Sequence, residues 1–430
     1  MLIFKGNALA DLTKLNEALV EYDMAIAMYE RLVNEEQQGP LANSLAGAYM
    51  NKSTALWDLR KLNEALVESN KAIAIRERLV NEEQQAHLAD DLAAAYVNKA
   101  ISLRGLTKLD EALGEYDKAI AIYERLVNEE RQAPPANDLA AAYMNKAISL
   151  RNLRKLDEAL GEYDKAIAIY ERLVNEEQQA HLANDLAAAY MNKAISLRNL
   201  NKLNEALGEY DKAIAIRERL VNEEQQAHLA NALAKAYLNK GAALWSLSKL
   251  NEARVEYDRA IAIYERLINE EQQAHLANDL AAAYLNKGLT LEKLGDSEGA
   301  ITYYESAVSV RRKCVDGSNM YWVLPDLLKV IRYWLMTLLD LERWPEAALS
   351  VREFLSRHDA YLKNDAIDDS LKQTAAAQAA GLASVVRGLT AEQRELLCAE
   401  LGNEAGALKS LVDAEGEVSA LGAADNSPQA

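Results

Sequence analysis

Apolar and polar positions follow one another along most of this chain with the spacing of amphipathic helices. Between Leu182 and Leu200, the residues Leu186, Tyr190 and Leu197 recur at steps of three, four or seven residues, which places them on one face of a helix. A second helix is predicted from near Asp157, where the apolar positions have the same spacing. These positions are Ala159, Leu160, Tyr163, Ala166, Ile167 and Tyr170. The pattern therefore predicts pairs of helices.

The same helix pair returns along the chain with a period of 47 residues. Its clearest marker is the string from Lys14 to Leu19. That string returns, with small changes, at Lys61, Lys108, Lys155, Lys202 and Lys249, and in weaker form at Asp296 and Arg343. One such pair cannot bury its apolar face alone, so neighbouring copies must stack and share a core. The sequence therefore predicts an all-α fold of tandem helix-turn-helix repeats.

The residues inside each repeat follow a pattern of large and small side chains. If Ala140 is numbered position 1, positions 4 and 24 are large, and positions 8, 20 and 27 are small. In this copy they are Tyr143, Tyr163, Ala147, Ala159 and Ala166. The pattern resembles the tetratricopeptide repeat over residues 1 to about 310. That resemblance implies a right-handed α-α superhelical solenoid, in which the first helix of each repeat lines a concave groove.

The repeat is longer than the 34 residues of a standard tetratricopeptide unit. Thirteen residues, such as Val174 to Leu186, follow the usual 34, and Glu171 stands where a proline is usual. We therefore expect the second helix to continue to about Gln179 and both helices to approach about 20 residues. Long repeats of this type are similar to those of kinesin light chains, which bind cargo peptides.

The repeat pattern also predicts how the chain is divided. Residues 1–310 form the tandem repeats, the first of which begins inside a helix because Gly6 occupies position 8. Residues 311–360 form a degenerate repeat, and residues 361–414 form a C-terminal helical cap. The cap is expected to contain two helices over residues 370–412, the second opening with a capping box at Thr390. Residues 415–430 are small and polar, which predicts a disordered tail.

The charge and the cysteine content limit the classes of partner. The formal net charge of −18 argues against a nucleic-acid partner and against an anionic membrane surface. No run of about 18 apolar residues is present to span a membrane. The two cysteines, Cys314 and Cys398, lie far apart in sequence and favour a reducing compartment. We therefore expect a cytoplasmic protein.

Candidate catalytic and metal-binding residues are few. Histidines occupy the same slot of four different repeats, so they cannot converge on one ion, and no metal or cofactor is expected. They are His87, His181, His228 and His275. No phosphate-binding glycine motif is present, and the acidic residues are expected on a solvated outer face. In one repeat these acids are Glu158, Glu162, Glu171, Glu176 and Glu177. The sequence therefore does not predict an enzyme.

The positions that face the groove in tetratricopeptide proteins suggest a binding surface. Position 6 is asparagine, whose carboxamide can both donate to and accept from a peptide backbone. Positions 5 and 12 add flexible apolar side chains and arginines, which are common in peptide interfaces. The predicted peptide-binding residues are Asn98, Asn145, Asn192, Asn239, Met144, Met191, Arg104, Arg151 and Arg198. The alternative is that these asparagines bond locally within the solenoid.

Together these features favour a non-enzymatic scaffold that binds an extended peptide or a partner helix in the groove. The arginines favour a partner with acidic side chains. The two-carboxylate clamp for chaperone C-termini is not expected, because no repeat combines lysine at position 5 with asparagine at position 9. The alternative function is a sensory or regulatory arm of a larger protein, with an effector domain upstream of Met1.

Overall fold

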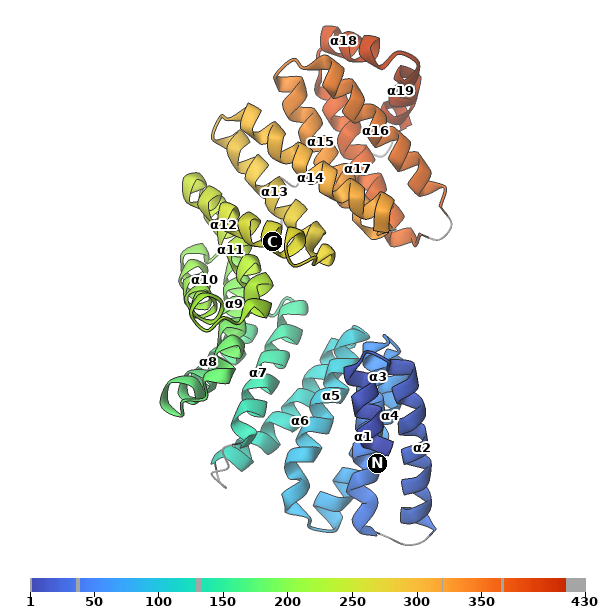
Figure 1. Cartoon of the computed structure of the whole chain (residues 1–430), viewed down its shortest axis with the longest axis vertical. Coiled ribbons are helices and arrows are strands. Elements are labelled where there is room, and N and C mark those ends of the chain that lie inside the picture. Colours follow the sequence, from blue (N-terminus) through green and yellow to red (C-terminus); the bar gives the residue numbers. More distant parts are fainter. Residues whose placement is uncertain (1, 36–38, 129–133, 319, 365–366, 415–430) are drawn as a thin grey trace. The chain divides into compact units, whose positions relative to one another are not determined.

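The computed structural model describes residues 2–35, 39–128, 134–318, 320–364 and 367–414 (Figure 1). These residues form helices and connecting turns, and no strand occurs among them. Contacts divide the chain into two units, Met1–Glu209 and Tyr210–Ala430. None of the described helices is long and apolar enough to cross a bilayer. The tail predicted for residues 415–430 lies outside the described residues.

Both units consist of helix pairs that follow one another in the chain. Consecutive helices pack together, as in α1 with α2, α3 with α4 and α13 with α14. The first unit contains α1 (Leu2–Asp11), α2 (Leu15–Asn34), α3 (Ala42–Asp58), α4 (Leu62–Glu77), α5 (Ala89–Gly105), α6 (Leu109–Asn128), α7 (Pro134–Asn152), α8 (Leu156–Glu171) and α9 (Ala183–Asn199). Helix α10 (Leu203–Glu218) spans the boundary between the two units. The predicted all-α fold of paired helices is confirmed.

The second unit continues with the same alternation and then with helices that lack the repeat pattern. Its helices are α11 (Ala230–Ser246), α12 (Leu250–Asn269), α13 (Ala277–Lys293), α14 (Ser297–Ser318), α15 (Leu324–Asp340), α16 (Trp344–Leu362), α17 (Asp369–Gly388), α18 (Ala391–Leu401) and α19 (Ala405–Ala414). Helix α17 packs on α15, and α18 packs on α16. The last helices therefore cover the degenerate repeat as a further layer.

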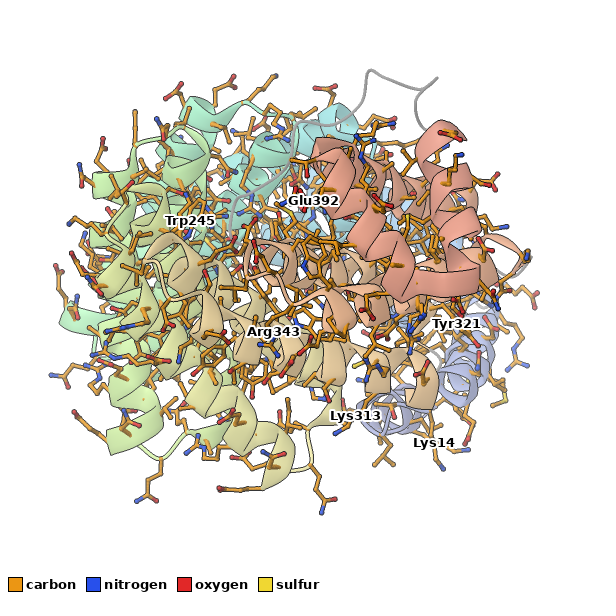
Figure 2. All side chains as sticks on the ribbon, turned by 90° about the horizontal axis from the view of Figure 1, so that it is seen from above. Lys14, Trp245, Lys313, Tyr321, Arg343 and Glu392 are labelled. Atoms are coloured by element: carbon orange, nitrogen blue, oxygen red, sulfur yellow. The ribbon has the colours of Figure 1, made fainter. Side chains whose placement is uncertain are left out.

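The turn between the two helices of a repeat has one conformation throughout. In the fourth repeat, Arg154 adopts a φ of 63°, and the Lys155 N–H donates to the Leu150 carbonyl at 2.9 Å. The left-handed conformation of Arg154 ends the first helix. The hydrogen bond from Lys155 to Leu150 then satisfies a carbonyl at the C-terminus of that helix. Most repeats place a lysine before the second helix, and the eighth places Arg343 there (Lys14 and Arg343 are labelled in Figure 2). The repeated lysine string thus marks a turn that reverses the chain.

The second helix ends earlier than predicted. Helix α8 is followed by one π-helical turn, Arg172–Glu176, and the chain leaves the helix at Gln178, whose φ is 54°. The Gln179 N–H then donates to the Leu173 carbonyl at 2.9 Å, which closes the helix end. A short 3-10 turn over Ala180–Leu182 precedes α9. The expectation that the helix continues to Gln179 is therefore wrong by about one turn.

Small side chains allow the helices of a repeat to approach closely around a tyrosine. Ala159 and Tyr163 have no exposed surface, and both pack in a cluster with Ala147. Where position 8 is glycine, as at Gly241, an added Cβ would lie 2.6 Å from the ring of Tyr257. The tyrosines at position 24 therefore fill the core between the two helices of a repeat.

Acidic side chains of the second helices bond to first helices of the same repeat or of the next one. Glu171, in the place of the usual proline, accepts a hydrogen bond from the Tyr190 hydroxyl of the following repeat. Glu162 accepts from Lys146 at 3.0 Å, and Lys146 also pairs with Asp117 of the preceding repeat at 2.8 Å. The predicted solvated outer face is therefore wrong for Glu162, which is half-buried, whereas Glu171 is exposed, as predicted, and also accepts the bond from Tyr190. The cause is the lysine at position 7, which brings acids from two repeats together.

The tyrosine–glutamate bond recurs at successive repeat interfaces. The other pairs are Tyr49–Glu30, Tyr96–Glu77, Tyr143–Glu124, Tyr237–Glu218 and Tyr284–Glu265. Each pair joins the second helix of one repeat to the first helix of the next, so a single residue pattern supplies the same contact many times.

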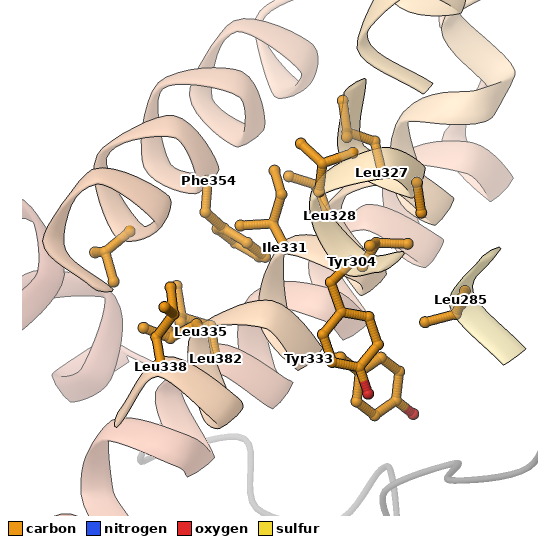
Figure 3. Packing of buried hydrophobic residues seen from close by; sticks show 14 of the residues in the cluster. Leu285, Tyr304, Leu327, Leu328, Ile331, Tyr333, Leu335, Leu338, Phe354 and Leu382 are labelled. Atoms are coloured by element: carbon orange, nitrogen blue, oxygen red, sulfur yellow. The ribbon is translucent and has the colours of Figure 1, made fainter. Parts of the chain in front are cut away.

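The degenerate repeat and the cap share one apolar core. In Figure 3 the ring of Phe354 from α16 lies beside Ile331 of α15, and Leu382 of α17 belongs to the same cluster. The predicted capping box is present, because the Thr390 hydroxyl accepts from the Gln393 N–H at 3.1 Å. The expectation of two helices over 370–412 is wrong, since Gly402 (φ 61°) separates α18 from α19.

Overpacking at position 20 is expected to destabilise the repeats. Ala159→Leu adds bulk where α8 meets its neighbours and should lower the free energy of unfolding by about 1–3 kcal/mol. Ala168→Leu is the matched control, because Ala168 is exposed on the same helix, and it should change stability by less than about 0.5 kcal/mol. Denaturant unfolding followed by circular dichroism measures both. Equal effects of the two substitutions would contradict this packing.

Alkaline pH is expected to unfold the repeats. Burial raises the pKa of Tyr116 to about 12, and burial, together with the bond to Glu171, raises the pKa of Tyr190. A raised pKa in the folded state means that stability is complete below the unfolded pKa of about 10 and falls as the pH rises toward 12. Helical circular dichroism and tyrosinate absorbance should therefore change together, and Tyr116→Phe should move the transition to higher pH. Tyrosines that ionise near pH 10 without loss of helicity would argue against this coupling.

Candidate binding groove

The asparagines at position 6 are held by the first helix and by the preceding repeat. The Asn145 Nδ2 donates to the Ala141 carbonyl at 3.0 Å, and its Oδ1 accepts from Arg104 Nη1 at 3.0 Å. Asn192 makes the same two bonds, with the Ala188 carbonyl and with Arg151, both at 3.0 Å. We call each arginine–asparagine bond between neighbouring first helices a latch. A latched carboxamide has one donor and one acceptor already in use within the protein.

Asn98 differs from these asparagines because the preceding repeat offers no arginine. Position 12 of that repeat is Trp57, and in the described part of the chain no hydrogen bond to the Asn98 carboxamide occurs. A pocket of about 290 Å³ opens between α3 and α5 at this point. It is lined by Ser53, Thr54, Trp57, Asp58, Asn98, Ile101, Ser102 and Arg104. The pocket therefore lies at the step of the groove where Trp57 and Asn98 form no latch.

Trp57 gives this pocket an aromatic wall. The Arg60 guanidinium lies 5.7 Å from the centre of the Trp57 ring, within the range of a cation–π contact. The indole Nε1 is buried and lacks an acceptor among the described residues. A buried N–H without a hydrogen-bond partner costs free energy. If the Trp57 ring turned toward a bound ligand, an acceptor on that ligand could remove this cost and so favour binding.

Other predicted site residues are less available. Met191 is 6% exposed, so most of its side chain belongs to the core. Met144 and Arg198 are half-buried. Asn239, in the second unit, donates from Nδ2 to the Lys235 carbonyl at 2.9 Å. The structure thus brings Asn98 and Arg104 together in one pocket, and it holds Asn145 and Asn192 in latches.

The second unit has a pocket of about 280 Å³ around another tryptophan at position 12, Trp245 (labelled in Figure 2). Lys293 Nζ lies 3.5 Å from the centre of the Trp245 ring, and Tyr333 and Met336 of the degenerate repeat complete the wall. The sequence analysis missed Tyr333 and Met336 as groove residues. Tyr333 and Met336 occupy positions 6 and 9 of the eighth copy of the repeat. These positions face the groove in tetratricopeptide proteins, so applying the same numbering to the eighth copy would have predicted both residues.

One acidic side chain, Glu292, lines this second pocket. Burial raises the pKa of Glu292, although the Tyr304 hydroxyl donates to its Oε2 at 2.6 Å. Among the described residues, no three His, Cys, Asp or Glu side chains are grouped so that they could hold a metal ion. The pockets therefore offer aromatic faces, amides and cations.

Models of the tetratricopeptide repeat match the chain in register with these helix pairs. One model matches residues 45–86, 92–132, 139–180, 186–227 and 233–274, and a second matches residues 281–314. These segments cover more than half of the sequence. The chain belongs to the tetratricopeptide repeat family. Domains of this family generally mediate binding to proteins or peptides.

Several solved structures are similar to this tetratricopeptide protein. BtubC (BKLC) from P. vanneervenii is 20% identical with a TM-score of 0.48, over 58% of this chain and 90% of BtubC. A Podosopora anserina protein described as a kinesin light chain with nearly identical repeats is 15% identical with a TM-score of 0.42, over 52% of this chain and 97% of its own. YrrB, a tetratricopeptide protein with an unusual peptide-binding site, is 19% identical with a TM-score of 0.34, over 55% of this chain and 91% of its own. No curated protein matches the sequence.

The latches of this tetratricopeptide protein can be tested by a double-mutant cycle. Arg151→Ala and Asn192→Ala each remove one partner of the same bond, so their effects on the free energy of unfolding should be coupled by about 0.5–1.5 kcal/mol. The cycle of Arg172→Ala with Asn192→Ala is the control, because Arg172 pairs with Glu177 instead. Additive effects of Arg151→Ala and Asn192→Ala would mean that both side chains are free to bind a ligand.

Proposed function

We propose that this tetratricopeptide protein is a non-enzymatic scaffold that binds an extended peptide or helix of a partner protein along its first helices. The observation that carries the proposal is the pocket between α3 and α5, where Trp57 stands in the place of a latch arginine and the Asn98 carboxamide makes no latch among the described residues. Aromatic and arginine side chains around a small apolar pocket are the groups that dominate protein interfaces.

The chemistry of the pocket indicates what it would hold. Trp57 and Ile101 offer an apolar surface for one side chain of the ligand, and the Asn98 carboxamide can exchange two hydrogen bonds with a peptide unit. Arg104 lines the same pocket and adds a positive charge, although Asn145 already accepts one of its hydrogen bonds. The preferred ligand is therefore an apolar peptide segment with an acidic residue near it.

The other residues that the sequence predicted for peptide binding are expected to contribute less to the affinity than those of this pocket. Asn145, Asn192, Arg151 and Met144 would contact a ligand only where a latch opens, and Asn239 and Arg198 remain candidates at their own steps of the groove. The free cysteines Cys314 and Cys398 are consistent with the cytoplasmic location that we propose.

Removing the aromatic wall is expected to weaken peptide binding. Peptides can be selected on the intact protein from a displayed library of random short sequences and then measured by fluorescence anisotropy. Trp57→Ala should cost about 2 kcal/mol of binding free energy, as for a tryptophan at the centre of an interface, and Asn98→Ala about 1 kcal/mol.

The matched control is Trp322→Ala, because Trp322 is exposed outside both tryptophan pockets. It should leave the affinity of the same peptides unchanged. Failure to select any peptide, or equal losses in the Trp57 and Trp322 variants, would argue against the proposed function.

A further inference from the structure

A pocket of about 370 Å³ lies between α15 of the degenerate repeat and α17 of the cap. Its walls include Arg332, Met336, Leu339, Asp340 and Val385. Tyr333 and Met336 also line the pocket around Trp245, so the two pockets of the second unit share a wall. An extended ligand that occupies one of them can therefore reach the other.

Arg332 lacks the acidic partner that neighbouring arginines have. Arg312 pairs with Glu353 at 2.6 Å and Arg357 with Asp316 at 2.9 Å. Arg332 makes no ion pair or hydrogen bond among the described residues, and its Nε is buried without an acceptor. The guanidinium carbon of Arg332 lies 5.4 Å from the centre of the Tyr333 ring.

Gly381 makes room for this guanidinium. A Cβ at Gly381 would lie 1.8 Å from Arg332 Nη1, so any larger residue would displace the guanidinium from this position. The arginine is thus held in place by α17, while its hydrogen-bonding groups remain without an acceptor.

We propose that Arg332 binds the carboxylate of an acidic side chain in the partner peptide. The inference rests on the proposed function and names one subsite of it. A guanidinium donates two parallel hydrogen bonds to a carboxylate, and a turn of the Arg332 side chain would bring the buried Nε to one of the carboxylate oxygens. Met336, Leu339 and Val385 surround the site with apolar surface, so the acidic residue is flanked by apolar neighbours in the ligand. Asp340 on the same wall disfavours a doubly charged phosphate, because like charges repel.

The test uses the intact protein and peptides selected on it from a displayed random library. The acidic residue shared by the selected peptides is changed to its amide in one synthetic copy and to phosphoserine in another. Replacing that acid, or making Arg332→Gln, should each weaken binding roughly tenfold or more. The two changes together should weaken it no further, and Arg332→Lys should retain part of the affinity.

Gly381→Ala tests the position of the guanidinium without removing it. Alanine favours the helix, so the fold should be kept, as circular dichroism can verify, while the displaced guanidinium binds the carboxylate more weakly. The controls are Arg312→Gln, since Arg312 is paired elsewhere, and Gly406→Ala, where an added Cβ meets nothing within 4 Å. Both controls should leave binding unchanged.

The possible results separate this inference from the proposed function. Peptides that bind the wild-type and Arg332→Gln proteins equally would overturn the carboxylate subsite and leave the groove as a binding surface. Tighter binding of the phosphoserine peptide than of the acidic one would replace the carboxylate by a phosphate. Failure to enrich any peptide on the wild-type protein would overturn both proposals.

Discussion

The close approach of helices around buried tyrosines is the constraint on which the remaining structure depends. Alanine at position 20 and a small residue at position 8 leave just enough space for the ring at position 24, as Ala159, Ala147 and Tyr163 do. Because a close-packed interior tolerates neither a gap nor added bulk, this contact fixes how the two helices of a repeat lie. The positions of the other residues at the interface between the two helices then follow from how far along the helix they lie from this contact.

Polar groups complete the contacts between repeats. A lysine at position 7 joins acids from two repeats, as Lys146 does, and a tyrosine at position 4 donates to a glutamate of the preceding repeat, as Tyr190 does. Many of the charged residues are therefore engaged in contacts within and between the repeats. The groups that remain for a ligand lie mainly where the repeat pattern is broken.

The two tryptophan pockets and the Arg332 pocket share this property. Trp57 and Trp245 replace the arginine of the central repeats, and Arg332 stands in the degenerate copy. A uniform row of identical steps can satisfy all its own hydrogen bonds, as the latches of Asn145 and Asn192 illustrate. Where a residue departs from the repeat pattern, a hydrogen-bond donor or acceptor is left without an internal partner, or a pocket is left unfilled. A ligand can bind to these groups and pockets selectively.

The sequence by itself determined the helix pairs, their period and the tetratricopeptide pattern, because these depend on local spacing and on side-chain size. It also pointed to position 6 and position 12 as groove residues. Only the tertiary structure decided that Arg104 and Arg151 bond to Asn145 and Asn192, and that Asn98 has no such partner among the described residues. Those partners lie 41 residues apart in the chain. Whether they meet depends on how neighbouring repeats stack, which is a property of the packed helices and not of local spacing.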